Sequence, residues 1–400
     1  MNHRFTVLLA LAWSALASPA HAEPMPLSRD QAIAQVLAHN PDLESARQAL
    51  AAARTRPEQI VLPDPVLSWG VVPGSLVGGP LSTRVDLRQG LPFPGTIEAT
   101  AASLEASAEA VEADVLAFGS VLALQAARLY DRLAWTRASD EVLVQHLALL
   151  DELRVSVEVR YATAATLALA LAEVDVARAH VEHRRMLLAS GGRQALVALN
   201  ALMGQDPELV VLVEPLSQPP VLAGQAELRP ELVAARERVR SAEHHQEAVR
   251  LDSLPSFAVS GTYNSMWMAP KDRWMVGVAV EVPLHAGARG AEIEEAEALA
   301  ARAGANADAL ELTLRAEALQ AEARYDEALD VLSLYEERLM PSAELSVELA
   351  RGAFEAGSLD FDVLIDAERT LRDTELDRLT ALATAWTAQA ELKVARGGQP

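Results

Sequence analysis

The sequence contains no cysteine, which excludes disulfides, thiolate metal sites, cysteine nucleophiles and a lipidated N-terminal cysteine. Aromatic residues make up only 4% of the chain although half of it is hydrophobic, and alanine and leucine supply much of that half. This composition favours long helices that pack closely through small side chains. A formal net charge of −22 leaves little room for a basic surface, so we expect no nucleic-acid partner.

The signals of common enzymes are also missing. The sequence shows no Gly-rich phosphate loop, no nucleophile elbow and no His-Glu-x-x-His run. Paired carboxylates arise by chance in so acidic a chain and carry little weight. The sequence therefore predicts neither an enzyme nor a cofactor.

Residues 1–22 have the pattern of a secretory signal peptide. His3 and Arg4 precede an apolar run over residues 7–16, and Ala20-His21-Ala22 fits a small-x-small cleavage site. The alternative is a membrane anchor, for which the run is short. We expect no later stretch to be apolar enough for a membrane helix, so a spanning form would use strands.

Two segments, residues 65–90 and 255–283, show the alternation of β-hairpins with a Gly- and Pro-rich loop. In a soluble protein their apolar faces would be half-buried, whereas in a membrane barrel they would meet lipid while the other face meets water. The alternating apolar positions are Leu67, Trp69, Val71, Thr83, Val85, Leu87, Val276, Val278, Val280 and Val282, and Arg84, Asp86 and Arg88 occupy the other face.

Most of the remaining chain is helical in composition. A first long helix extends from about residue 96 to 161, and a second arm of about 65 residues begins near Arg289 and approaches 100 Å in length. Pro341 is expected to kink the second arm. A coiled-coil seam is formed by Leu143, Leu147, Leu150, Leu153 and Val157.

The stretch 354–368 interrupts the second arm and predicts the tip of a helical hairpin. Gly357 suits the end of one helix because glycine takes positive φ at little cost, and Ser358 is expected to cap the next. A similar, weaker break stands at residues 161–166.

The order of these elements occurs twice, with a period of about 190 residues, far above the 20–50 of a solenoid unit. We divide the mature chain into a first repeat, 23–204, a linker, 205–224, and a second repeat, 225–396. Their helical tips are expected near 162–166 and 355–360. Each half supplies only two strands, and open strand edges cannot sit in lipid, so other copies must complete a barrel; a trimer would supply about twelve strands.

This chain resembles the outer-membrane factor family, the TolC-like exit ducts of Gram-negative efflux pumps. The resemblance covers nearly the whole mature chain and rests on the duplicated order together with Gln89-Gly-Leu-Pro-Phe-Pro-Gly95, Val282-Pro-Leu-His-Ala-Gly287 and the Phe354-x-x-Gly-Ser358 tip. The Leu91-Pro-Phe-Pro-Gly95 exit is most similar to the branch that serves heavy-metal exporters.

The resemblance implies a mainly α protein with a small β part. It implies a homotrimer with a twelve-stranded β-barrel in the outer membrane and a twelve-helix α-barrel in the periplasm. Its partners would be outer-membrane lipid, a periplasmic adaptor that docks on the tips, and an inner-membrane pump joined through that adaptor. Its function would be passive passage of cargo, heavy-metal cations in that branch, from the periplasm to the exterior.

The resemblance also implies site residues. Asp366 occupies the place of an acidic entrance constriction, with Asp362 one turn earlier on the same face and Asp360 nearby. A bland interpretation of these carboxylates is helix capping and solvation. The docking tips would comprise Tyr161, Ala164, Thr166, Phe354, Gly357 and Ser358, although Ala164 replaces the usual glycine and Leu359 a common arginine.

No metal site is predicted. Met266, Met268 and Met275 are soft ligands, but such residues more often belong to a loop tip and an interfacial aromatic girdle. The pairs His244-His245 and His180 with His183 are expected on solvated helix surfaces.

A different class of protein remains open. A soluble periplasmic coiled-coil adaptor or scaffold would explain the long arms and the signal peptide. It would not explain two hairpins with segregated faces.

Overall fold

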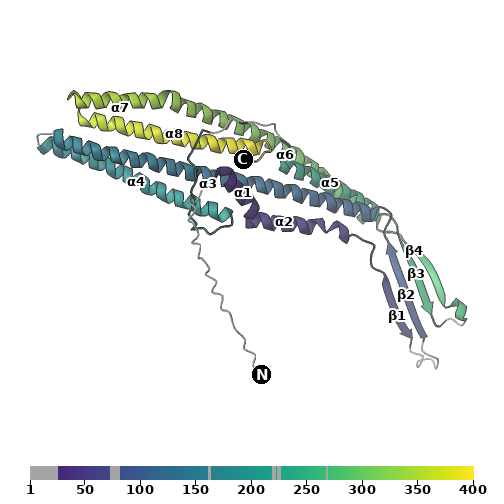
Figure 1. The fold of residues 1–400 in the computed structure, drawn as a ribbon. Coiled ribbons are helices and arrows are strands. Elements are labelled where there is room, and N and C mark those ends of the chain that lie inside the picture. The colour runs from purple at the N-terminus through teal and green to yellow at the C-terminus, as the bar shows by residue number, and fades with distance from the viewer. Residues whose placement is uncertain (1–25, 73–81, 161–163, 219–221, 223–226, 267–268) are drawn as a thin grey trace, which may run out of the picture.

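The computed structural model describes residues 26–72, 82–160, 164–218, 222, 227–266 and 269–400, so the expected signal peptide lies outside the described residues. Figure 1 shows an elongated molecule in which long helices lie side by side and a sheet extends from one end. The fold is mainly helical with a small antiparallel sheet, as the sequence predicted.

The first half contains α1 (Arg29–His39), α2 (Pro41–Arg54), a short 3-10 turn (Pro57–Gln59), β1 (Val66–Val72), β2 (Ser82–Leu91), α3 (Thr96–Arg160) and α4 (Ala164–Leu202). The second half contains α5 (Pro230–Asp252), β3 (Ser256–Asn264), a 3-10 turn (Pro270–Asp272), β4 (Trp274–Glu281), α6 (Ala286–Leu334), a π-helical turn (Tyr335–Leu339), α7 (Met340–Glu355) and α8 (Phe361–Ala395).

The returning helix of each half ends in the same way. Gly204 follows α4 with φ 66°, and a Cβ there would lie 2.6 Å from the carbonyl oxygen of His39. Gly397 follows α8 with φ 88°, and a Cβ there would lie 2.6 Å from the carbonyl oxygen of Glu227. Glycine is therefore required at both positions by conformation and by space. These contacts pack the end of α4 against the residues just before α2, and the end of α8 against the residues just before α5.

The N-terminal helices begin as the sequence predicts. Ser28 and Gln31 form a capping box at α1, in which the Gln31 amide donates to Ser28 Oγ at 3.2 Å. Asn40 caps α2 by accepting hydrogen bonds from the amides of Asp42 and Leu43.

The sheet has the order β1-β2-β3-β4, and all neighbouring pairs are antiparallel. The central pair, β2 with β3, joins the two halves of the chain, and Val85 there lies opposite Tyr263. The sheet therefore requires both halves to form.

The longest helix, α3, has 65 residues, which corresponds to about 98 Å. It is also long and apolar enough to cross a membrane. Its most apolar 18-residue window has a mean hydropathy of 1.4, and 44% of that window is buried in the fold. The expectation that no stretch after the N-terminal run meets this criterion is therefore wrong for α3. Core helices pass the same test, and α3 packs against α4, α5 and α8.

The core is long and narrow rather than central. One cluster of buried side chains fills the end far from the sheet, where α3, α4, α7 and α8 meet. Two more clusters follow the helices towards the sheet, and alanines such as Ala126 and Ala385 are fully buried in them. Small side chains thus allow the close helix packing that the composition indicated.

A π-helical turn interrupts the second long arm beside Pro341, where the sequence predicted a kink. This turn, Tyr335–Leu339, ends just before Pro341 and separates α6 from α7. Proline cannot donate its amide to the preceding turn, and a π-helical turn absorbs that loss locally.

Candidate functional site

The sheet has one apolar and one polar face, and among the described residues no helix packs extensively against either face (Figure 1). On the apolar face Val276 is 81% exposed, Val278 73% and Trp69 72%. The register places Trp69 opposite Val85, Val85 opposite Tyr263, and Tyr263 opposite Trp274. So large an exposed apolar surface is rare on soluble monomers and indicates contact with lipid or protein.

The other face carries the charges of β2. Arg84 lies 3.8 Å from Asp86, and Thr262 of β3 donates a hydrogen bond from Oγ1 to the Asp86 carboxylate. Small residues such as Gly277 and Ala279 continue this face across β4. The predicted separation of an apolar face from a polar face is therefore present across all four strands.

Both outer edges of the sheet are open. Among the described strands, β1 pairs only with β2, and β4 pairs only with β3. Unpaired backbone amides and carbonyls at such an edge are satisfied by water or by a further strand. The sheet is thus incomplete as a membrane-spanning structure when one copy stands alone.

Two of the residues considered for a soft-metal site, Met266 and Met275, lie near the free end of β3 and β4. Met266 and Met275 are exposed, and Met268 lies outside the described residues. Trp274 and Tyr263 form a tilted pair with ring centroids 5.0 Å apart. Within the described part of the chain, no group of three or more His, Cys, Asp or Glu side chains could hold a metal ion.

The second helical tip differs from the sequence expectation at Ser358. Gly357 ends the helical segment with φ 80°, as predicted. Ser358, however, does not cap α8, because its Oγ donates to the Ala353 carbonyl at 3.0 Å and so closes the end of α7. Asp360 is the N-cap residue of α8, with extended backbone and no side-chain hydrogen bond of the capping kind.

The tip is held together by an aromatic pair. Phe354 at the end of α7 and Phe361 at the start of α8 are both buried, with ring centroids 5.8 Å apart. They belong to the same core cluster as Val157 of α3, so this tip is anchored to the neighbouring helical hairpin.

The three carboxylates of the expected constriction are exposed at the start of α8. Asp362 and Asp366 lie four residues apart on one helix face, and Asp360 precedes them. Asp366 keeps 67% of its side-chain surface exposed and forms an ion pair of 2.8 Å with Arg369. Arg369 was not predicted from the sequence as part of this site, and its positive charge offsets that of Asp366.

The first tip is described only in part. Tyr161 lies outside the described residues, and the backbone of Ala164 and Thr166 belongs to α4, which begins at Ala164. The described side chains of the expected docking surface therefore all belong to the second tip.

A polar cluster near the tips was not predicted from the sequence. Glu368 of α8 is buried and forms an ion pair of 2.7 Å with Arg351 of α7. His146, buried on α3 within the leucine seam, faces Arg372 and Asp373 of α8. Burial and then the charge of Arg372 lower the pKa of His146 to about 4.

The histidine pairs lie on helix surfaces, as expected. His180 and His183 are exposed on α4 and line a groove of about 550 Å³ beside Arg184. His244 and His245 lie on α5, where adjacent residues point in different directions.

Comparisons with known proteins agree with this geometry. Residues 224–398 match the family described as Outer membrane efflux protein. No curated protein sequence matches the chain. Among solved structures, CusC, studied for folding and transmembrane channel formation, is 20% identical with a TM-score of 0.80, over 96% of each chain.

Two further solved structures, from Neisseria gonorrhoeae and Vibrio cholerae, have a similar fold. The outer-membrane channel MtrE of Neisseria gonorrhoeae, in its open state, is 19% identical with a TM-score of 0.79, over 93% of this chain and 89% of that one. The outer-membrane protein VceC of Vibrio cholerae is 18% identical with a TM-score of 0.75, over 92% of this chain and 96% of that one. The second half of this chain thus matches the model of the Outer membrane efflux protein family, and the whole chain shares the fold of these solved structures. The resemblance predicted from the sequence is confirmed.

Proposed function

We propose that the protein is the outer-membrane exit duct of a tripartite efflux system and works as a homotrimer. The observation that carries this proposal is the sheet, which has an exposed apolar face, a polar face and two open edges. The outer membrane efflux protein domain in residues 224–398 supports it independently.

The physics of the bilayer leads from the sheet to the trimer. Lipid would cover the face of Trp69 and Val278, and water would fill the side of Arg84 and Asp86. An open edge cannot remain in hydrocarbon, because each unsatisfied amide or carbonyl there costs several kcal/mol. Pairing β1 of one copy with β4 of the next removes every edge. Three copies give about twelve strands, above the minimum of about eight for a membrane barrel.

The helices would continue the passage away from the membrane. They extend from one end of the sheet, for about 98 Å in the case of α3. With the sheet in the outer membrane, such a length lies in the periplasm and brings the tips towards the inner membrane. The duct carries out no chemistry in this proposal and conducts passively.

The tips would dock a periplasmic adaptor, which joins the duct to an inner-membrane pump. Gly357 and Ser358 are exposed at the turn, while Phe354 holds the turn from inside. Tyr161, Ala164 and Thr166 would complete the surface from the first tip. Asp360, Asp362 and Asp366 would form an acidic entrance once three copies meet. Heavy-metal cations are the proposed cargo, in keeping with that acidic entrance and with the Leu91–Gly95 exit.

The experiment is single-channel recording of the purified protein in a planar bilayer, together with fractionation of cells that produce it. We expect heat-resistant trimers in the outer-membrane fraction and discrete, cation-preferring currents. Recovery of the folded protein in the soluble periplasm, with no currents from it, would overturn the proposal and favour a coiled-coil scaffold.

A further inference from the structure

One side of α8 is covered by other parts of the same chain. Trp386 donates a hydrogen bond from Nε1 to the carbonyl oxygen of Ser217, in the linker, at 2.7 Å. The guanidinium of Arg29, the first residue of α1, lies 5.1 Å from the centre of a Trp386 ring. The linker and α1 therefore pack on the Trp386 side of α8.

The opposite side of α8 is polar, and no other described segment covers it, so we call it the bare side. Helical geometry places Thr384 about 160° around the axis from Trp386. Asp377, Thr380 and Thr384 are exposed on this side, and Thr387 is half-exposed. Asp366 lies on the same side nearer the tip, because it precedes Asp377 by 11 residues, which is about three helical turns. The bare side is therefore a continuous polar stripe, rather than a gap in the core.

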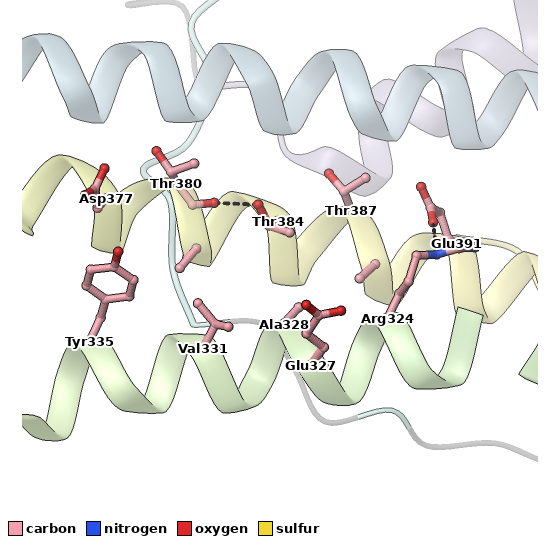
Figure 2. Close-up of a pocket in the computed structure, with 12 residues that line it drawn as sticks. Arg324, Glu327, Ala328, Val331, Tyr335, Asp377, Thr380, Thr384, Thr387 and Glu391 are labelled. Carbon is pink, nitrogen blue, oxygen red and sulfur yellow. Dashed lines mark hydrogen bonds and ion pairs between the residues drawn. The ribbon is translucent and has the colours of Figure 1, made fainter. Parts of the chain in front are cut away.

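Two grooves border this stripe. The first, of about 500 Å³, lies between α6 and α8, and Figure 2 shows Tyr335, Val331 and Arg324 across it from α8. The second, of about 380 Å³, lies between α3 and α8. Thr380, Thr384 and Thr387 line both grooves. The layer formed by α3, α8 and α6 thus has one covered face and one bare face.

Contacts within the chain set the geometry of the bare face. Glu391 accepts from Arg128 of α3 at 2.6 Å and lies 3.3 Å from Arg324 of α6, so one carboxylate links three helices. Trp135 of α3 donates to Thr380 Oγ1 at 3.1 Å. Thr384 Oγ1 donates to the Thr380 carbonyl at 2.8 Å. The face needs no further chain to satisfy these groups.

We propose that this bare face is the inner wall of the duct, with Thr380, Thr384 and Asp377 exposed to the passing cargo. The proposal rests on the proposed function, because only a closed ring of copies has an inside. In such a ring the covering linker and α1 must lie outside, since three copies of them inside would obstruct the passage. A hydrated threonine surface also suits an inner wall, because it presents hydroxyls and methyl groups without a strong electrostatic trap.

The charge along the stripe predicts how cargo moves. Asp362 and Asp366 stand at the entrance, Asp377 follows, and the threonines continue towards the middle of the molecule. Cations entering past the carboxylates therefore reach threonine hydroxyls on α8, bordered by charges of both signs such as Glu327 and Arg132, which hold them weakly. Conduction requires binding that is weak enough to release the ion.

The chain has no cysteine, so single-cysteine variants can map the wall directly. We would prepare Thr384→Cys and, as a matched control, Ser217→Cys, which replaces an exposed small polar residue on the covered side. Each would be modified with a positively charged thiol reagent, confirmed by mass spectrometry, and recorded in a planar bilayer. We expect modification to reduce conductance and cation preference in Thr384→Cys and to change neither in Ser217→Cys.

Two results would overturn the proposal. One is an unchanged current after full labelling of Thr384→Cys, and the other is a block that occurs only in Ser217→Cys. If Thr384→Cys does not assemble, Asp377→Cys tests the same wall with the same criteria. Absence of currents from the unmodified, folded protein would instead overturn the proposed function, so the two failures are distinguishable.

Discussion

Arg29 and Asp131 form an ion pair of 2.8 Å in which 10% and 3% of the two side chains remain exposed. The pair fixes the start of α1 to the middle of α3, and Arg29 also lies over Trp386 of α8. Removal of one partner would leave a buried charge without compensation. We expect Asp131→Ala to destabilise the protein by about 3 kcal/mol and to lower its thermal midpoint in detergent.

The matched control is the exposed pair of Arg54 and Glu112. Glu112→Ala removes a carboxylate from an ion pair of 2.7 Å whose side chains are about half exposed. A surface pair contributes about 0–1 kcal/mol, so the midpoint should barely move. Equal losses in Asp131→Ala and Glu112→Ala would contradict the importance assigned to burial.

His146 predicts a loss of stability in mild acid. Its pKa lies at about 4 in the folded protein, against 6.5 as the ordinary value. The unfolded chain therefore takes up a proton as the pH falls below about 6.5, whereas the folded chain does not until about pH 4. The contribution of neutral His146 to the free energy of unfolding is present above pH 6.5. It is lost progressively down to pH 4, by at most about 3 kcal/mol.

The measurement is the thermal midpoint of the wild type and of His146→Leu between pH 7.5 and 4.5. The two proteins differ only at residue 146, so the difference between the two curves reports on His146 and its interactions with Arg372 and Asp373. We expect the wild type to lose more stability than the variant on acidification. Parallel curves would show that the folded protein protonates His146 as readily as the unfolded chain does.

The strands were predictable because alternation is a local signal. A strand turns successive side chains to opposite faces, so the sequence of residues 82–91 alone assigned Val85 and Arg84 to different sides. The same holds for the seam of α3, where Leu143, Leu150 and Val157 are buried as the spacing indicated. Periodicity of this kind needs no knowledge of partners.

Long-range pairs could not be predicted in the same way. Arg29 and Asp131 are separated by 102 residues, and nothing in either neighbourhood marks the other as its partner. His146 stands in a leucine seam whose spacing reports burial but not the Arg372 that faces it. The prediction that Ser358 caps α8 was wrong for a related reason. Phe361 is buried against Phe354, and this tertiary contact places the start of α8 after Asp360.

The two faces of β4 predict opposite responses to a lysine. Val278→Lys places a charge on the apolar face, which costs about 2–4 kcal/mol per copy near the bilayer midplane. Ala279→Lys places the same charge on the polar face, next along the strand. We expect Val278→Lys to reduce the trimer recovered from the outer membrane several-fold, and Ala279→Lys to leave it nearly unchanged. Quantitative gel analysis of unheated membrane samples measures both, and the reverse order would exchange the two faces.

Asp366 and Arg369 predict opposite changes in ion preference at the entrance. The two side chains form an ion pair of 2.8 Å, so each offsets the charge of the other. Asp366→Ala removes the carboxylate and side-chain bulk. We expect higher conductance and a reversal potential nearer to zero in a salt gradient. Arg369→Ala leaves Asp366 without this partner and should strengthen cation preference.

Glu208→Ala is the control, because Glu208 is an exposed carboxylate in the linker, away from the tip. It should change neither conductance nor reversal potential. If Asp366→Ala and Arg369→Ala shift the reversal potential in the same direction, the pair acts through the shape of the tip. If neither shifts it, Asp366 does not face the passage.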